Sequence, residues 1–266
     1  MAMWRIEEVG KKLSLNNPIV IEGLPGIGNV GKVAVDFIIE ELKAVKLYYI
    51  TSYSFPHSVF INEDNLTELP SVGIYYKRYN SKNKQDIVFI AGDVQPVNES
   101  DSYEFSDKML DICEELGSKH IITLGGIGLP DIPKHPKVYC TGNSQEAINK
   151  YKDVVVSNKI YGVVGPIIGV SGLMVGLAKR RNLSAVAILA ETYGHPIYVG
   201  ITSAREIIKV LNNKVGLGIK LEKLDKEIKE MEKEILRRTE ELNEVTKLKT
   251  LKKLKGKLGH ETSYIG

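Results

Sequence analysis

Cysteine is scarce in this chain, with only Cys113 and Cys140 among its 266 residues. The two form neither a C-x-x-C pair nor another metal-ligand spacing, so the sequence gives no reason to expect a metal site. Cys113 falls on the apolar face of a helical pattern with Met109, Leu110 and Leu116, which is typical of a buried structural thiol. Nothing in the cysteine usage requires an oxidising compartment.

Long hydrophobic runs and a strong charge of one sign are missing as well. No window approaches the roughly 20 apolar residues of a membrane-spanning helix. Near the N-terminus Arg5, Glu7 and Glu8 stand where a signal peptide needs an apolar run. The net charge of +3 is too small to indicate a polyanionic partner by itself. The sequence therefore predicts a cytoplasmic protein that does not contact a membrane.

Short apolar runs alternate with helical patterns over most of the chain. We expect strands at residues 18–21, 47–55, 59–61, 72–79, 87–93, 120–124, 138–141, 154–156 and 185–190. We expect helices at residues 30–42, 103–116, 145–151, 173–181 and 203–212. Strands that alternate with helices, with glycine after several of them, predict an α/β body of three layers (αβα) built on a mostly parallel sheet.

Polar and glycine residues mark some of the expected element ends. Asp101 with Glu104, and Ser203 with Glu206, have the spacing of capping boxes at helix starts. The glycines of residues 125–128 are expected to end the strand that precedes them.

The composition changes after Gly216, which we take as the end of a body of residues 1–215. Apolar residues then follow the three-four spacing of a heptad from Leu221 to Val245, with Arg238 at one core position. This pattern predicts a coiled-coil-like helical arm at residues 216–259, followed by a flexible tail at residues 260–266. The apolar stripe of the arm cannot be buried by the arm alone, so it must pack on the body or on another chain.

The end of the arm is basic, with six lysines and no acid in residues 246–258. Three of them, Lys252, Lys253 and Lys255, are candidate contacts to an acidic partner surface. A solvated helix face is the alternative interpretation of the run. Nucleic-acid binding ranks last among the interpretations, because neither arginine nor an aromatic residue interleaves the lysines.

A glycine-rich turn follows the first expected strand and contains Gly23, Gly26, Gly28 and Gly31. It matches G-x-G-x-x-G, and with Lys32 most of a P-loop, in which backbone amides approach a phosphate at a helix N-terminus.

Each nucleotide interpretation lacks one requirement. Val33 replaces the serine or threonine that ligates magnesium, and no acid ends the second strand to bind a ribose. We therefore favour glycines that permit a tight turn and close helix-on-sheet packing. A nucleotide-binding enzyme that uses residues 26–32, with Asp93 as a further acid, remains the alternative.

Other polar residues give weaker catalytic signals. Gly169, Ser171 and Gly172 resemble part of a nucleophile elbow without its second spaced glycine, so we expect Ser171 to be an N-cap or turn residue. Glu191 ends a buried strand and is expected to accept hydrogen bonds from the following turn. The five histidines are scattered, and each, His120 included, is interpreted as a loop or surface residue. No catalytic residue and no cofactor are expected.

Three blocks together resemble a known family: residues 23–31 (GLPGIGNVG), 165–173 (GPIIGVSGL) and 189–196 (LAETYGHP). They are similar to signature blocks of the archaeal proteasome-assembly-chaperone family, second type, over about residues 18–211. The resemblance implies a phosphorylase/hydrolase-like fold, similar to that of purine nucleoside phosphorylases but without their active site. It also implies ring-like homo-oligomers that bind proteasome α-subunits or the α-ring.

The resemblance also implies a role for the C-terminal tail. In the family, a C-terminal hydrophobic-Tyr-any residue motif enters pockets between α-subunits. Here Ser263, Tyr264, Ile265 and Gly266 end the chain, so the tyrosine is one position too early and serine precedes it. Tyr264, Ile265 and Gly266 are nevertheless candidate partner-binding residues. The predicted function is that of a non-catalytic proteasome assembly chaperone homologue, which could also modulate the assembled core particle.

Overall fold

The structure is a computed structural model that describes residues 4–9, 14–79, 81, 84–155, 165–226 and 228. The chain divides into two compact units, Met1–Ile219 and Lys220–Gly266. Most of the predicted arm, including its basic end, and the whole predicted tail lie outside the described residues. The division into body, arm and tail therefore stays a prediction, and the fold below is that of the first unit.

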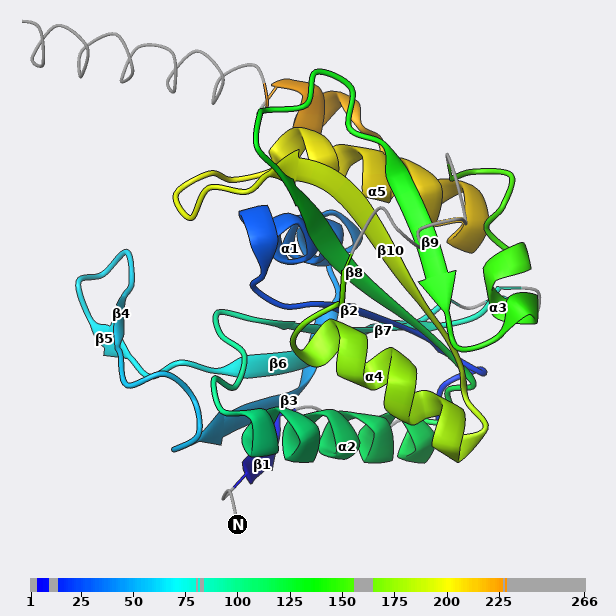
Figure 1. The fold of residues 1–266 in the computed structure, drawn as a ribbon. Coiled ribbons are helices and arrows are strands. Elements are labelled where there is room, and N and C mark those ends of the chain that lie inside the picture. The colour runs from blue at the N-terminus through cyan, green and yellow to red at the C-terminus, as the bar shows by residue number, and fades with distance from the viewer. Residues whose placement is uncertain are drawn as a thin grey trace, which may run out of the picture. The chain divides into compact units, whose positions relative to one another are not determined.

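An eight-stranded sheet with the order β1-β3-β6-β7-β2-β8-β10-β9 forms the centre of this unit (Figure 1). Its strands are β1 (Trp4–Glu8), β2 (Ile19–Gly23), β3 (Val45–Ser52), β6 (Val72–Lys77), β7 (Ile87–Gly92), β8 (His120–Leu129), β9 (Val138–Gly142) and β10 (Ser184–Tyr193). A separate hairpin joins β4 (Phe60–Ile61) to β5 (Thr67–Glu68).

The sheet is mixed, so the expectation of a mostly parallel sheet was wrong. Strands β7, β2, β8 and β10 are parallel neighbours at its centre, whereas β1, β3, β6 and β9 all pair antiparallel. The physical reason lies in the connections. Residues 78–86 between β6 and β7 are too few for the crossover that parallel neighbours require, and residues 53–71 between β3 and β6 carry the β4–β5 hairpin instead of a helix.

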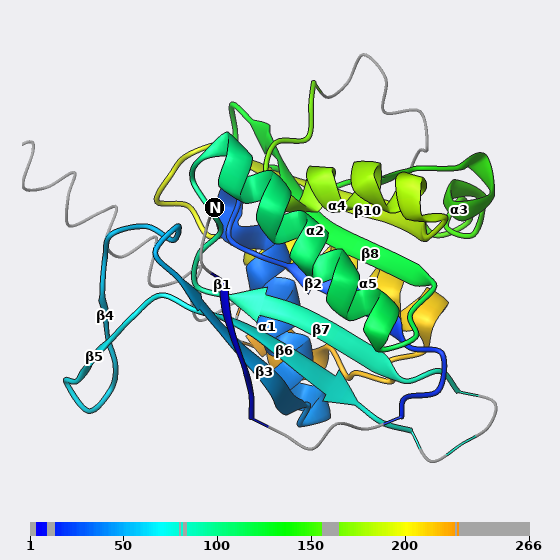
Figure 2. The ribbon, with the colours of Figure 1, turned by 90° about the horizontal axis from the view of Figure 1, so that it is seen from below.

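Helices cover both faces of the sheet. Helices α2 (Glu99–Glu115) and α4 (Val170–Ala178) pack together over one face, and α1 (Val30–Leu42) and α5 (Ile201–Val215) lie over the other (Figure 2). Shorter helical segments complete the unit: η1 (Ile27–Asn29), α3 (Gln145–Asn149) and η2 (Lys179–Arg181). The predicted α/β class is confirmed, and the unit resembles an αβα sandwich on a mixed sheet.

Neither predicted capping box begins a helix. Helix α2 starts at Glu99 with Asn98 as its N-cap, and α5 starts at Ile201 with Gly200 as its N-cap. Ser203 lies inside α5, where its hydroxyl donates a hydrogen bond to the carbonyl of Glu191 at 2.6 Å. Both helices begin earlier than expected: Asn98 has the extended backbone of an N-cap residue and Gly200 precedes α5, and a capping-box spacing is a local signal that does not by itself fix a helix boundary.

Two strand predictions also need correction. Strand β8 continues through its glycines to Leu129, because β10 pairs with it along its whole length. Of the predicted strand at residues 154–156, Val154 and Val155 form a turn, and residue 156 lies outside the described residues.

The hydrophobic core between the sheet and the α2–α4 layer has an aromatic centre near the sheet edge. Trp4 lies 5.1 Å from Phe105 and 5.6 Å from Phe55 between ring centroids. These contacts attach β1, an edge strand that the sequence patterns did not predict, to helix α2 and to the segment that follows β3. Cys113 is buried in the same core, as expected.

Candidate functional site

A cavity of about 560 Å³ opens at the carboxyl ends of β2 and β8. This is the edge at which open α/β sheets usually bind ligands. Its walls come from the glycine-rich turn, from the second half of β8, from the segment before α4 and from one residue of β10: Leu24, Pro25, Gly26, Ile27, Gly31, Gln95, residues 124–128, residues 165–168, Ser171 and Leu189. The three sequence blocks, widely separated along the chain, therefore meet at one place.

Close packing accounts for two glycines of the turn. A Cβ atom on Gly23 would lie 2.3 Å from the carbonyl oxygen of Gly31, and a Cβ on Gly31 would lie 2.5 Å from the carbonyl oxygen of Leu124. Both contacts are with backbone atoms, which cannot rotate away. Gly23 and Gly31 thus let helix α1 approach β2 and β8 more closely than any side chain would allow.

The other two glycines of the turn differ from each other. Gly28 has φ of 60° in the left-handed region, and its α-carbon faces Thr192, whose Oγ1 would be 2.7 Å from an added Cβ. Gly26 is extended at φ −159°, and no atom lies within 4 Å of the position of an added Cβ. Gly28 is therefore needed for turn conformation and packing, whereas Gly26 borders open space at the cavity.

Gln95 connects the glycine-rich turn to the start of α4. Its Nε2 donates to the carbonyl of Pro25 at 2.6 Å, and its Oε1 accepts from the amide of Val170 at 3.1 Å. Gly169 at φ 92° leaves room for this side chain, because an added Cβ would lie 2.6 Å from Gln95 Oε1. A Cβ on Gly172 would lie 2.3 Å from the carbonyl oxygen of Ile167.

Lys32, the lysine of the P-loop-like pattern, forms ion pairs within the protein. Its Nζ lies 2.9 Å from Asp36 Oδ2 and 3.1 Å from Asp93 Oδ1, and it donates to the carbonyl of Gly92 at 3.2 Å. Burial alone would lower the pKa of Lys32, but the two carboxylates outweigh it and raise that pKa. Asp93 thus serves as a partner of Lys32.

Glu22 is a fully buried carboxyl group beneath the cavity. Its Oε2 accepts a hydrogen bond from Ser171 Oγ at 2.9 Å, and its Oε1 accepts one from the amide of Leu24 at 3.1 Å. Burial raises the pKa of Glu22 to about 7, because two hydrogen bonds do not replace the lost hydration of a carboxylate. Ser171 is in the first turn of α4 and Gly169 is its N-cap, so the expectation that Ser171 caps the helix was wrong.

Two further polar residues have other partners than expected. Glu191 accepts hydrogen bonds from the hydroxyl of Tyr139 at 2.8 Å and the amide of Lys137 at 3.1 Å, both outside the turn that follows it. The ring of His120 contacts Ser184 Oγ at 3.0 Å and Tyr151 OH at 2.8 Å. His120 is half-buried at the start of β8, so its interpretation as a loop or surface residue was wrong; burial lowers its pKa to about 4.

The chemistry available in the described part of the chain is limited. Its histidine, cysteine and carboxylate side chains form no cluster of three that could hold a metal ion. Burial raises the pKa of Cys113 and of Cys140 to about 12, which disfavours the reactive thiolates. Within the described ranges, no helix has the length and apolar character needed to cross a membrane.

Comparison with known proteins identifies the family. A family model described as the PAC2 family matches residues 20–238. The chain belongs to the PAC2 family. This match and the two solved structures described next together confirm the resemblance to archaeal proteasome assembly chaperones that the three sequence blocks indicated.

Both of those structures are from Pyrococcus furiosus. PbaB, described as an archaeal proteasome activator, matches this PAC2 chain with a TM-score of 0.82 and 33% identity, covering 90% of this chain and 100% of that one. PbaA, described as an archaeal homolog of proteasome-assembly chaperone, matches with a TM-score of 0.73 and 25% identity, covering 98% and 99%. An uncharacterized protein of Methanocaldococcus jannaschii is 28% identical over 218 residues, which are 82% of this chain and 81% of that one.

The predicted site residues fall into two groups. Of the predicted glycines, Gly26 and Gly31 line the cavity, whereas Gly23, Gly28, Gly169 and Gly172 lie in the segments that form its walls without being part of the lining. The candidate partner contacts Lys252, Lys253, Lys255, Tyr264, Ile265 and Gly266 lie outside the described residues. Sequence reasoning missed Glu22 and Gln95 as parts of the site; a lone acid within the apolar run of residues 18–23 was the available signal for the first.

Proposed function

We propose that this protein is a non-catalytic partner of the proteasome that binds α-subunits or the assembled α-ring, as an assembly chaperone or a modulator of the core particle. The observation that carries the proposal is the similarity to PbaB, an archaeal proteasome activator, over 90% of this chain at 33% identity. Membership in the PAC2 family and the further similarity to PbaA support the same conclusion.

The geometry of the glycine-rich turn favours a protein-binding role over a nucleotide-binding enzyme. Gly23 and Gly31 are needed for backbone packing, and Lys32 is neutralised by Asp36 and Asp93. None of the described residues that line the cavity is a lysine or an arginine, and the group beneath it is the carboxyl of Glu22. A phosphate there would lack the cation that nucleotide sites usually provide.

In this proposal the C-terminal part of the chain supplies partner contacts. The helical arm of residues 216–259 associates copies of the chain into a homo-oligomer, and Lys252, Lys253 and Lys255 attract it to an acidic surface of the proteasome. Tyr264, Ile265 and Gly266 then provide an aromatic group close to a terminal carboxylate for a pocket of the α-ring.

Electron microscopy of the full chain mixed with α-rings, and separately with whole core particles, tests the proposal. We expect added density on the outer α-surface in at least one of the two mixtures; density with isolated α-rings alone would indicate an assembly role. Calorimetry with ATP, GTP and NAD, with and without magnesium, is the parallel test of the nucleotide alternative. Saturable nucleotide binding that Lys32→Ala abolishes would replace the proposed function with that alternative.

A further inference from the structure

The segment between β3 and β6 exposes an unusual amount of apolar surface. Six of the fifteen large apolar side chains that the described part of the chain exposes belong to it: Tyr53, Val59, Phe60, Ile61, Leu66 and Leu69. Their exposed fractions range from 41% to 83%. Three of them, Tyr53, Val59 and Leu69, line one cavity, and exposed apolar side chains that gather at one place are typical of an interaction site.

The β4–β5 hairpin, which carries three of these side chains, Phe60, Ile61 and Leu66, stands apart from the main sheet (Figure 1). Strands β4 and β5 pair only with each other among the described strands, through two residue pairs. Asn62 stiffens the connecting turn, because its Oδ1 accepts from the amides of Asp64 at 3.0 Å and Leu66 at 2.9 Å. An isolated two-stranded hairpin is at best marginally stable in water, so a partner segment that packs on this hairpin would stabilise it.

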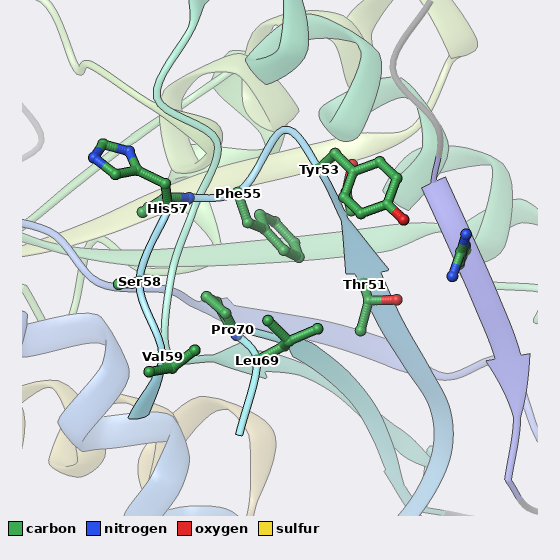
Figure 3. Close-up of a pocket in the computed structure, with 11 residues that line it drawn as sticks. Thr51, Tyr53, Phe55, His57, Ser58, Val59, Leu69 and Pro70 are labelled. Atoms are coloured by element: carbon green, nitrogen blue, oxygen red, sulfur yellow. The ribbon is translucent and has the colours of Figure 1, made fainter. Parts of the chain in front are cut away.

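A second cavity, of about 490 Å³, lies at the base of this hairpin. Figure 3 shows Phe55, Val59, Leu69 and Pro70 around it, with the ring of His57 turned away from Leu69 and Pro70. The walls are therefore mainly apolar. The volume is within the range of about 300–1,000 Å³ that is typical of ligand-binding cavities.

Arg5 supplies the charge at this cavity. Its guanidinium carbon lies 5.5 Å from the centroid of the Tyr53 ring, and both residues line the cavity. None of the ion pairs within the described part of the chain involves Arg5, and no acidic residue is among the described lining. Stacking on tyrosine occupies the face of a guanidinium but leaves its N–H edge available to a carboxylate.

We propose that this cavity is a binding site for an extended peptide segment of a partner protein that presents a large apolar side chain next to a carboxylate. The apolar side chain enters between Phe55 and Leu69, and the carboxylate pairs with Arg5. The unpaired outer edges of the hairpin allow the segment to bind in an extended conformation, as in strand addition to an exposed edge. The site is separate from the glycine-rich cavity and does not depend on proteasome binding.

Fluorescence anisotropy with three fluorescein-labelled heptapeptides tests the proposal on the full chain. Their central residues are Leu-Phe-Asp, Leu-Phe-Asn and Ala-Ala-Asp. We expect the first to bind most tightly, the second about fivefold to tenfold more weakly because it lacks the charge-assisted pair, and the third not to bind. In the Arg5→Gln variant, the Asp and Asn peptides should bind equally.

Two matched surface variants locate the site. Leu69 lines the cavity and is 64% exposed, whereas Leu66 is 62% exposed at the hairpin turn and is not part of its described lining. We expect Leu69→Asp to weaken binding of the Leu-Phe-Asp peptide more than about tenfold and Leu66→Asp to leave it unchanged. Equal losses in both variants, equal binding of the Asp and Asn peptides to the wild type, or no binding of any peptide would overturn the proposal. So would a change of oligomeric state in Leu69→Asp without peptide binding to the wild type, which would assign the surface to a second copy of the chain.

Discussion

Ser171 Oγ donates a hydrogen bond of 2.9 Å to Glu22 Oε2 and so joins the first turn of α4 to β2 across 149 residues of sequence. Both oxygens of the carboxyl have a protein donor, since the amide of Leu24 contacts Oε1. The pair sits beneath the cavity where the three family blocks meet. Because the carboxyl is fully buried, its protonation is linked to the stability of this region.

The first prediction concerns pH. The pKa of Glu22 rises from 4.5 to about 7 on folding, so the folded protein binds this proton more tightly than the unfolded chain. Its stabilising effect is complete below pH 4.5 and is lost as the pH rises to 7 and above, by an amount on the order of 3 kcal/mol. The Glu22→Gln variant lacks this titration, so its stability relative to the wild type should increase over that interval.

Urea denaturation of both proteins at pH 4.5, 6 and 7.5 measures the difference. The comparison removes the opposing contribution of His120, whose pKa of about 4 makes both proteins less stable as the pH falls below 6.5. A difference in unfolding free energy between the two proteins that stays constant across the three pH values would contradict the prediction.

The second prediction concerns the glycine-rich turn. Gly31→Ala and Gly23→Ala each place a methyl group against a backbone carbonyl, so each should destabilise the protein by about 1–3 kcal/mol, the usual cost of overpacking. Gly26→Ala is the matched control: its backbone is extended and its Cβ meets open space. We expect Gly26→Ala to change stability by less than about 1 kcal/mol, and to raise it if anything, because alanine restricts the unfolded chain. Similar losses of stability in all three variants would contradict the prediction, because contact with a backbone carbonyl would then not explain the cost of the substitutions.

The third prediction concerns Arg181, which attaches the end of the α4 segment to α2. Its guanidinium contacts Asp107, Asp111 and Glu114 at 2.7 to 2.9 Å. Although burial alone would raise the pKa of Asp111, the hydrogen bonds from Arg181 and Lys108 lower it.

Arg181→Lys should lower the unfolding free energy by about 1 kcal/mol, because an ammonium group cannot make the same set of directed hydrogen bonds. Thermal melts at low and high salt measure the effect, which should shrink as salt screens the network. Arg180→Gln serves as the control, since Arg180 is exposed and forms no ion pair among the described residues. Equal melting temperatures for the wild type and Arg181→Lys at low salt would refute the network.

Local signals in the sequence predicted some elements well. The helix expected at residues 30–42 is α1 with the same bounds, because its apolar spacing and the preceding glycine turn are encoded within a few residues. The direction of the flanking strands was not predictable in the same way, since it depends on pairing between distant segments. Strand β1 was missed because most of its residues face solvent, and its attachment through Trp4 depends on Phe105 of a distant helix.

The candidate site was predicted in part for the same reason. The glycine blocks were visible as motifs, and a family model of PAC2 matches the part of the chain that contains them. The hydrogen-bond partners of the polar residues could not be predicted, because the two residues of each pair are far apart along the chain: Glu22 and Ser171, and Gln95 and Val170. No local pattern encodes such a contact. Likewise, the spacing of the P-loop-like pattern could not predict that Asp93 pairs with Lys32.

Binding of the full chain to immobilised archaeal core particles, measured by surface plasmon resonance at low and high salt, decides whether this protein acts on the proteasome. We expect saturable binding at low salt that weakens with added salt. We also expect weaker binding after deletion of residues 264–266 or after the combined change of Lys252, Lys253 and Lys255 to glutamate. Absence of binding to core particles and to α-rings at low salt would contradict the claim that this protein acts on the proteasome.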